Sequence, residues 1–336
     1  MGRPCSCRNR QSVLECRAMV GREQPPLDLA IVIVSYNVCD LLRDCLASVY
    51  ESRGNFAFAV CVVDNGSQDG SVEMVRAEFP QVQVVANAAN LGYSAANNQG
   101  LRCFGFGTPE GEAAPERLPR YALLLNPDTL LPPHALADML AFMEAHPEAG
   151  AAGPRLVLAD GTLDWACRRS FPSPEVSFYR LSGLSRLFPH SRRFGRYNLT
   201  YLDPDETAEV DSVVGAFMMV RREAIQQAGL LDEEFFMYGE DLDWAYRIKA
   251  AGWKVFYNAD VTVLHYKEAS SKKSRRAQDE FYRAMLIFYR KHYAAQTPPW
   301  LHPLIVGGIR LRWWLARLGW RDTARPRASA AGEASR

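Results

Sequence analysis

The sequence lacks the short motifs that would assign it to two large classes of nucleotide-binding protein. It contains no G-x-x-x-x-G-K-[ST] segment, which excludes a P-loop enzyme. No G-x-G-x-x-G follows its first strand-like segment, so a dinucleotide-binding fold is poorly supported. The chain also lacks a run of about 18 uncharged apolar residues, and residues 1–26 contain no sustained apolar stretch. We therefore expect neither an ordinary membrane span nor a signal peptide.

An excess of charge of one sign is also missing. The chain has 39 Lys and Arg residues against 38 Asp and Glu residues, a formal net charge of +1. No global field attracts nucleic acid, so we expect no nucleic-acid partner, and any anion-binding site must be local. The eight cysteines lie mostly in apolar segments such as "FAVCVVD", where a free thiol acts as a small hydrophobe. A reducing, cytosolic setting is the default for such a chain.

What the sequence does contain is an alternation of strand-like and helix-like segments from residue 28 onward. "LAIVIVS" at 29–35 is a continuous apolar run rich in β-branched residues, and apolar residues recur at helical spacing in 39–51. Further strands are predicted at 58–64, 82–87, 121–126 and 149–158, and further helices at 70–78, 94–103, 133–146 and 241–252. This order predicts an α/β fold with a mostly parallel central sheet flanked by helices.

Polar residues follow each of the first four predicted strands. The set comprises Ser35, Tyr36 and Asn37, then Asp64, Asn65 and Ser67, then Asn90 and Gly92, and finally Asn126 and Asp128. Ligands of an open parallel sheet bind beyond the carboxyl ends of its strands. Each residue has a structural alternative, for example Asn37 as a helix cap. A purely structural interpretation does not explain why four consecutive strand ends present hydrogen-bonding groups.

An acidic pair, Glu240 and Asp241, lies in "FFMYGEDLDWAYRIKAAG" directly before a predicted helix. The helix dipole alone favours acidic residues there, and Asp243 is explained by it. The aromatic approach to the pair could line a sugar pocket. A carboxylate whose pKa is raised by partial burial and by an acidic neighbour can accept a proton from a hydroxyl group.

Seven segments, read in order, resemble glycosyltransferase family 2, and most closely its rhamnosyltransferase-type members. They are "IVIVSYN", "VVDNGSQDGS", "NLGYSAANNQG", "LLLNPDT", "GAFMMVRREA", "LDEEFFMYGEDLDWAYRIKAAGW" and "VLHYKEAS". The resemblance covers residues 28–270 and implies a GT-A fold, with a nucleotide-binding half at 28–120 and an acceptor and catalytic half at 121–270. Residues 271–320 are predicted to form a C-terminal helical extension. The tails, 1–27 and 321–336, are predicted to be disordered, and 105–120 is predicted to be a surface loop.

The resemblance also implies roles for the polar strand ends. Ser35, Tyr36, Asn37 and Asp64 would hold the base and ribose of a nucleotide-diphosphate sugar, with Asn65 and Ser67 nearby, and Asn90, Gly92 and Asn98 would shape the pocket beside them. Asp128 would be the carboxylate of the family's metal motif for Mg²⁺ or Mn²⁺, and His265 a further ligand; a structural histidine is the alternative. The motif departs from many relatives in having Asn126 where they carry Asp, which implies weaker metal binding without nucleotide. The family's general base corresponds to Asp241, with Glu240 supporting it at the acceptor.

Residues near the acceptor are less sharply indicated. Gly215 would permit close approach of a substrate. Arg168 and Arg169 in "DWACRRSFPSP" could bind phosphate, or could form a solvated charged pair. Trp165 could stack on a sugar face or simply pack in the core.

Two segments suggest contact with a membrane surface. Residues 180–196 combine five arginines with Leu and Phe, which indicates either a solvated insert or a surface for phospholipid head groups. Residues 300–320 contain four tryptophans and interspersed arginines, a pattern that favours an amphipathic helix in the membrane interface over core packing.

Together these features predict an inverting hexosyltransferase that moves a sugar, with dTDP-rhamnose as the candidate donor, to a lipid-linked or polysaccharide acceptor of the cell envelope. The expected location is the cytoplasm, at the inner face of the cell membrane. Two alternatives remain open: a non-catalytic module that binds nucleotide sugar or glycan, and a nucleotidyltransferase of similar fold.

Overall fold

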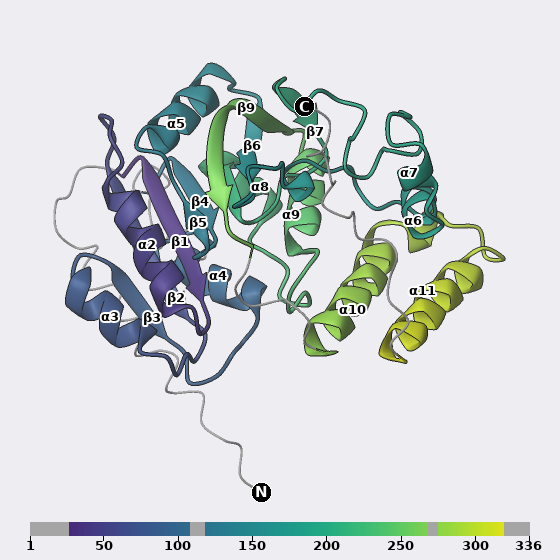
Figure 1. The fold of residues 1–336 in the computed structure, drawn as a ribbon, viewed down its shortest axis with the longest axis horizontal. Helices are drawn as coiled ribbons and strands as arrows, with labels where there is room; N and C mark the ends of the chain where they lie inside the picture. The colour runs from purple at the N-terminus through teal and green to yellow at the C-terminus, as the bar shows by residue number, and fades with distance from the viewer. Residues whose placement is uncertain (1–26, 108–117, 268–274, 319–336) are drawn as a thin grey trace, which may run out of the picture.

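The computed structural model describes residues 27–107, 118–267 and 275–318 (Figure 1). The two predicted tails, apart from Leu27, and most of the predicted loop at 105–120 lie outside the described residues.

Three parallel strands form one side of the central sheet: β1 (Leu29–Ser35), β2 (Phe58–Asp64) and β3 (Gln83–Ala86). They alternate with helices α2 (Cys39–Tyr50), α3 (Ser71–Glu78) and α4 (Tyr93–Cys103). All of β1 is buried, as expected of a parallel strand covered on both faces, which explains its unbroken apolar sequence. Because β1 and β2 run in parallel with Ser35 opposite Asp64, their polar ends meet at one edge.

The second half of the chain adds strands of both directions. Strand β4 (Tyr121–Leu125) lies parallel to β1, and β8 (Phe217–Arg221) is antiparallel both to β4 and to β6 (Ala149–Val157). Strand β9 (Lys254–His265) is parallel to β6, and the short strands β5 (Thr129–Leu130) and β7 (Ala208–Val210) pair antiparallel with it. The order is β3-β2-β1-β4-β8-β6-β9-β5, with β7 beside β9, so the α/β prediction is confirmed, with a mixed sheet.

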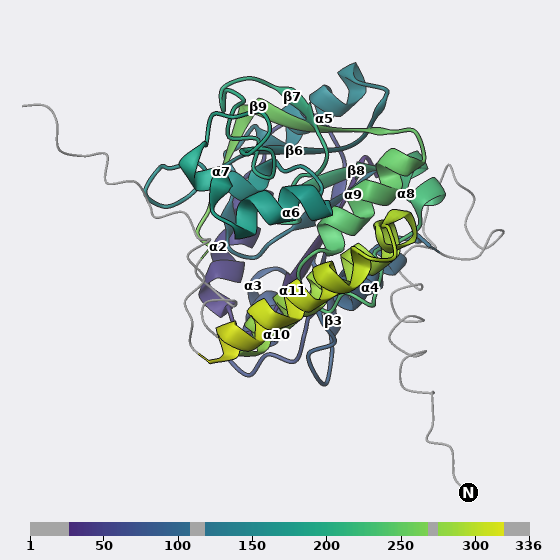
Figure 2. The same cartoon turned by 90° about the vertical axis from the view of Figure 1, so that its right-hand side faces the viewer.

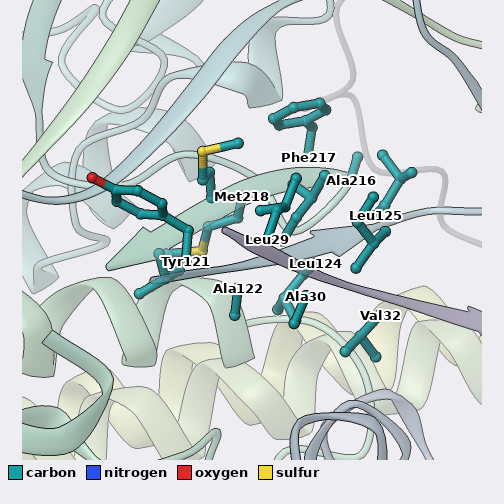
Figure 3. Close-up of a cluster of buried hydrophobic side chains, with 14 of the residues drawn as sticks. Leu29, Ala30, Val32, Tyr121, Ala122, Leu124, Leu125, Ala216, Phe217 and Met218 are labelled. Atoms are coloured by element: carbon teal, nitrogen blue, oxygen red, sulfur yellow. The ribbon is translucent and has the colours of Figure 1, made fainter. Parts of the chain in front are cut away.

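Three helices accompany these strands: α5 (Ala135–Ala145), α8 (Arg222–Ala228) and α9 (Glu240–Ala250). Figure 3 shows side chains of β1, β4 and β8 packed together, among them Val32, Leu124 and Phe217. These three side chains are at most 1% exposed. Burial of this kind stabilises the fold by about 1.5–3 kcal/mol for each large apolar side chain.

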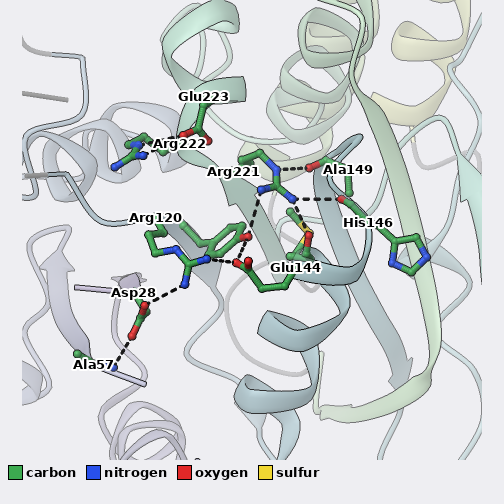
Figure 4. A network of polar contacts seen from close by, with 11 residues as sticks. Asp28, Ala57, Arg120, Glu144, His146, Ala149, Arg221, Arg222 and Glu223 are labelled. Carbon is green, nitrogen blue, oxygen red and sulfur yellow. Dashed lines mark hydrogen bonds and ion pairs between the residues drawn. The ribbon is translucent and has the colours of Figure 1, made fainter. Parts of the chain in front are cut away.

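A polar network ties the strand starts together at the edge of the sheet opposite the polar strand ends (Figure 4). Arg120 pairs with Asp28 at 3.2 Å and with Glu144, and the Arg221 side chain donates to the carbonyl oxygen of Ala149 at 2.8 Å. Each charged group in this network has a partner within the protein. The network therefore has a structural role, and the other edge remains for ligands.

Four helices gather on the far side of the molecule from β3 (Figure 1): α6 (Pro174–Leu181), α7 (Leu184–Leu187), α10 (Arg275–His292) and α11 (His302–Arg317). Single 3-10 turns occur at Trp165–Cys167 and Ala294–Gln296. Helices α10 and α11 run side by side (Figure 2), and the Trp313 indole donates to Asp279 at 2.6 Å between them. The predicted C-terminal helical extension is thus confirmed. No helix in the described parts of the chain is long and apolar enough to cross a bilayer.

Candidate active site

Two unpaired polar atoms lie side by side at the ends of β1 and β2. One carboxylate oxygen of Asp64 accepts hydrogen bonds from the backbone N–H groups of Gly66 at 3.0 Å and Ser67 at 2.8 Å. Among the described residues, its other oxygen and the hydroxyl of Ser35 have no partner, although the two residues are 2% and 0% exposed. Buried polar atoms are rarely left unpaired, so this pair indicates a place for a polar ligand.

The loops after β1 and β2 hold each other in place. Asn37 has a left-handed backbone (φ 54°), its N–H donates to the hydroxyl of Ser67 at 2.9 Å, and its side-chain oxygen accepts from the N–H of Gln68 at 2.8 Å. Asn37 therefore bridges two loops rather than capping helix α2. Tyr36 remains 42% exposed on this rigid rim, where its ring is available for stacking.

The segment after β3 is fixed by amide side chains. The Asn65 amide donates to the carbonyl of Gly92 at 3.1 Å, and Asn90 accepts from the N–H of Gly92 at 3.0 Å. Gly92 has φ 92°, and a Cβ there would lie 2.6 Å from the carbonyl oxygen of Phe236, so only glycine fits. Asn98, predicted to shape the pocket, is instead saturated inside the protein, because its amide bonds both backbone groups of Leu231 at 2.8 and 3.0 Å.

A chain of contacts connects the acidic pair to the end of β4. Asp241 accepts a hydrogen bond from the N–H of Gly215 at 3.1 Å. The Tyr93 hydroxyl lies 2.9 Å from the Gly215 carbonyl oxygen and 3.0 Å from the side-chain oxygen of Asn126, which is two residues before Asp128.

The electrostatics of Tyr93 support the same arrangement. Burial, followed by the negative charges of Glu240, Asp241 and Asp128, raises the pKa of the Tyr93 phenol well above its usual value. Carboxylates from two distant parts of the chain, Glu240 with Asp241 and Asp128, thus act on one phenol.

The two acidic residues have different surroundings. Asp241 forms a buried ion pair with Arg169 at 2.6 Å. Glu240 is 7% exposed, and one of its carboxylate oxygens has no hydrogen-bond partner in the part of the chain that the structure describes. Burial, and then the neighbouring charge of Asp241, raises the pKa of Glu240 to about 8. Asp243 is fully buried and binds Arg247 and His292, each at 2.8 Å, which is a structural role.

A second polar cluster lies where β5 pairs with β9. The pairing of Thr129 with His265 brings the Nε2 atom of His265 to 3.4 Å from Asp128. The Nδ1 atom of His265 lies 3.0 Å from Asp164, which also binds Lys267 at 2.7 Å. Burial lowers the pKa of His265, but hydrogen bonds with Asp128 and Asp164 outweigh it and raise the pKa to about 9.

Comparison with known proteins assigns the family. Residues 25–279 match the sequence profile described as "Glycosyltransferase like family 2". The chain is 31% identical over 243 residues to the N-acetylglucosaminyl-diphospho-decaprenol L-rhamnosyltransferase of Mycobacterium tuberculosis, covering 72% of this chain and 77% of that protein. The chain belongs to glycosyltransferase family 2. The chain is also 25% identical to the low-salt glycan biosynthesis hexosyltransferase Agl10 of Haloferax volcanii, and the match covers 71% of this chain and 67% of that protein.

Solved structures agree on the fold. A mannosyltransferase from Pyrobaculum calidifontis, in complex with GDP-Man and Mn²⁺, superposes with a TM-score of 0.50 at 17% identity, covering 94% of this glycosyltransferase and 80% of that chain. GalNAc-T7 with UDP, GalNAc and Mn²⁺ gives a TM-score of 0.53 at 14% identity, covering 91% and 60% of the respective chains. The predicted GT-A fold is therefore confirmed.

The described residues of this glycosyltransferase could supply two ligands of a metal site, and the other ligands would have to come from a bound donor. Within the described residues, no group of three or more His, Cys, Asp and Glu side chains could hold a metal ion by itself. Asp128 and His265 lie close enough to serve as two ligands, and Asp164 fixes the orientation of the imidazole through its other nitrogen, as carboxylates do in many metal sites. Because the pKa of His265 is about 9 without a metal, an ion that bound here would displace the proton on Nε2. A divalent ion bound here would take its remaining ligands from the donor diphosphate, a common arrangement for Mg²⁺.

Of the residues predicted near the acceptor of this enzyme, Arg169 and Gly215 both contact Asp241, whereas Arg168 has other partners. Arg168 is fully buried, and its guanidinium donates to the carbonyl oxygens of Leu202 and Asp203, so the prediction that it grips phosphate needs correction. Arg169 is occupied by Asp241 rather than exposed for phosphate. Trp165 is half-buried directly after Asp164.

Sequence reasoning missed two residues of the site, Tyr93 and Asp164. Tyr93 lies in "NLGYSAANNQG", and its position between a glycine and a predicted helix was the only feature that could have indicated a role in the site. Asp164 had none, because a single acidic residue in "GTLDWA" is unremarkable in a turn.

Proposed function

We propose that this enzyme transfers rhamnose, with inversion, from dTDP-rhamnose to a sugar carried on a lipid diphosphate. The sugar and the acceptor class are suggested by the name of the mycobacterial relative, which is 31% identical. The observation that carries the mechanism is the run of contacts from Asp241 through Gly215 and Tyr93 to Asn126, beside Asp128.

The donor would bind at the ends of β1, β2 and β4. The unpaired atoms of Ser35 and Asp64 suit the base and ribose, and Tyr36 offers an exposed ring beside them. Asn65, Ser67, Asn90 and Gly92 hold the surrounding loops in a fixed shape, which limits the entropy lost when the nucleotide binds.

The metal ligands would be Asp128 and His265. A divalent ion held there supplies electrostatic stabilisation of the negative charge that develops on the leaving diphosphate. Asn126, in the position of a second carboxylate in relatives, is bound to the Tyr93 hydroxyl and preserves the shape of the turn.

Asp241 would act as the general base and Glu240 as its neutral partner. The ion pair with Arg169 balances the charge of Asp241. Its Oδ2 atom accepts hydrogen bonds from Arg169 and Gly215, whereas Oδ1 accepts one from the N–H of Leu242 at 2.7 Å and retains a lone pair for the proton of the acceptor hydroxyl. With a pKa of about 8, Glu240 carries a proton at neutral pH and can donate a hydrogen bond to the acceptor. The two adjacent acids therefore take different roles.

The C-terminal helices would rest on the inner face of the cell membrane, where a cytoplasmic nucleotide sugar and a lipid-linked acceptor can meet. Five large apolar side chains on and beside α11 are 56–69% exposed. They are Trp300, Leu304, Leu311, Trp314 and Leu318. Exposed tryptophans and leucines with nearby arginines are typical of helices that lie in the membrane interface.

The replacement Asp241→Asn tests the assignment. We expect transfer from dTDP-rhamnose to fall by at least about a hundredfold, as is usual when a general base is lost. Binding of dTDP-rhamnose, measured by calorimetry, should remain within about twofold of wild type. Glu240→Gln is the matched control, because it preserves shape and hydrogen bonding, and it should retain most activity at neutral pH. Unchanged turnover in Asp241→Asn would remove Asp241 from the mechanism.

A further inference from the structure

An open pocket separate from the Asp128 and Asp241 cluster is rich in arginine. It has a volume of about 480 Å³ and is lined by Glu175, Tyr179, Arg192, Arg193, Arg196 and Tyr201. We call it the arginine pocket. None of its lining residues appears in the donor site or among the proposed catalytic residues.

Part of the positive charge in this pocket is not neutralised. Arg193 donates to the Tyr179 hydroxyl at 2.7 Å and lies 3.6 Å from Glu175, so that carboxylate is already paired. Arg192 and Arg196 are exposed, and within the described residues their guanidinium groups form no hydrogen bond or ion pair. Two adjacent free guanidinium groups suit a ligand with phosphate oxygens, which arginine binds in a bidentate manner.

The arginine pocket adjoins a second pocket. This second pocket of about 340 Å³ shares Arg196 and Tyr201 with it and is also lined by Ser170. Ser170 is 3% exposed, and its hydroxyl has no hydrogen-bond partner within residues 27–107, 118–267 and 275–318. It directly follows Arg169, the ion-pair partner of Asp241. A ligand held by the arginines could therefore extend along these two pockets as far as Ser170, the sequence neighbour of Arg169.

Exposed apolar side chains lie beside the arginine pocket, and we call them the apolar rim. The Phe194 ring contacts Tyr179 at 4.9 Å and Phe188 at 5.5 Å between centroids. Phe188 is 47% exposed and the adjacent Leu187 is 70% exposed. Helix α6, which carries Tyr179, is also bound to α11 by a hydrogen bond from Arg312 to the Leu181 carbonyl at 3.0 Å. The apolar rim is thus attached to the proposed membrane-facing helices.

We infer that the arginine pocket binds the diphosphate of the lipid-linked acceptor, with Arg192 and Arg196 on its phosphate oxygens and the start of the lipid chain on Phe188 and Leu187. A basic pocket that has exposed apolar side chains nearby and a second pocket beside it suits such an acceptor, in which a lipid, a diphosphate and a sugar follow one another. This inference rests on the proposed lipid-diphosphate acceptor and assigns it a binding site.

Direct binding tests the inference without any transfer reaction. Farnesyl diphosphate would be titrated into the full chain in the presence of EDTA, because removal of divalent metal suppresses binding of diphosphate at the donor site. The comparison probes are inorganic pyrophosphate, which carries only the charge, and farnesol, which carries only the chain. We expect farnesyl diphosphate to bind more tightly than either probe, because it engages both the arginines and the apolar rim.

The double replacement Arg192→Ala/Arg196→Ala should weaken farnesyl diphosphate binding by about tenfold for each arginine. Arg76→Ala is the control, since Arg76 is an exposed arginine on α3, on the other side of the molecule (Figure 1). In transfer assays the double variant should raise the KM for a farnesyl-diphosphate-linked sugar while leaving kcat and the KM for the donor unchanged. Equal farnesyl diphosphate affinity in wild type and the double variant would overturn the inference.

Binding to vesicles that contain phosphatidylglycerol distinguishes two roles for the arginine pocket: a site for the acceptor diphosphate and a site for phosphates of membrane lipids in general. If the double variant loses vesicle binding but keeps its affinity for farnesyl diphosphate, the arginines bind membrane lipid and the inference is wrong. If wild type binds farnesyl diphosphate through the arginines but transfers no rhamnose, the diphosphate site stands and the proposed donor is wrong.

Discussion

Replacing Glu240 with glutamine should remove a pH-dependent loss of stability from this protein. The pKa of Glu240 is raised from 4.5 to about 8 in the folded protein, first by burial and then by the charge of Asp241. The folded state therefore binds this proton more tightly than the unfolded state does. The stabilisation is fully present below pH 4.5 and is lost progressively as the pH rises through about 8. Over that interval, each pH unit lowers the free energy of unfolding by up to about 1.4 kcal/mol.

Glutamine at this position has the same shape and does not titrate. Urea unfolding of wild type and Glu240→Gln at a series of pH values measures the difference directly. We expect the variant to gain stability relative to wild type between pH 5 and 8, with a plateau above about 8. Wild-type transfer should also decline above about pH 8, when Glu240 ionises, whereas the variant should not show this decline. Parallel stability curves across this range would refute the raised pKa and the neutral role of Glu240.

Three other substitutions probe separate parts of the site. Gly92→Ala should lower the free energy of unfolding by about 1–3 kcal/mol in urea titrations, because residue 92 has a positive φ and a Cβ there would lie 2.6 Å from the carbonyl oxygen of Phe236. The control is Gly70→Ala, which also has a positive φ but no atom within 4 Å of the added Cβ, and it should lower the free energy of unfolding less. Asp164→Asn should weaken Mn²⁺ binding to the nucleotide-loaded enzyme by about 10–100-fold in calorimetry, and unchanged affinity would exclude its orienting role. Asp243→Ala should destabilise the protein by about 1–3 kcal/mol, because it removes the buried carboxylate that binds His292 and the half-buried Arg247, and a loss below 1 kcal/mol would contradict a structural ion pair.

The parallel strands and their polar ends could be predicted because the signals are local. The apolar run at 29–35 defines β1, and helical spacing at 39–51 defines α2 to within one residue. In a parallel arrangement the ends of neighbouring strands must meet, so the proximity of Ser35 and Asp64 followed from the strand assignments.

The long-range pairings could not be predicted in the same way. His265 meets Asp128 only because β5 pairs antiparallel with β9, and no local pattern encodes that register. Arg168 and Arg169 are adjacent in the sequence, yet one binds backbone carbonyls and the other binds Asp241. Neighbouring side chains of an extended segment point to opposite sides, and the sequence does not specify what lies on each side.

The central claim is that Asp241 activates the acceptor on the face of the sugar opposite the leaving diphosphate. The most direct test is the anomeric configuration of the product, read from the one-bond carbon–proton coupling at the anomeric carbon of the transferred rhamnose. The account predicts a configuration opposite to that of the donor. A product with the donor's configuration retained would contradict it.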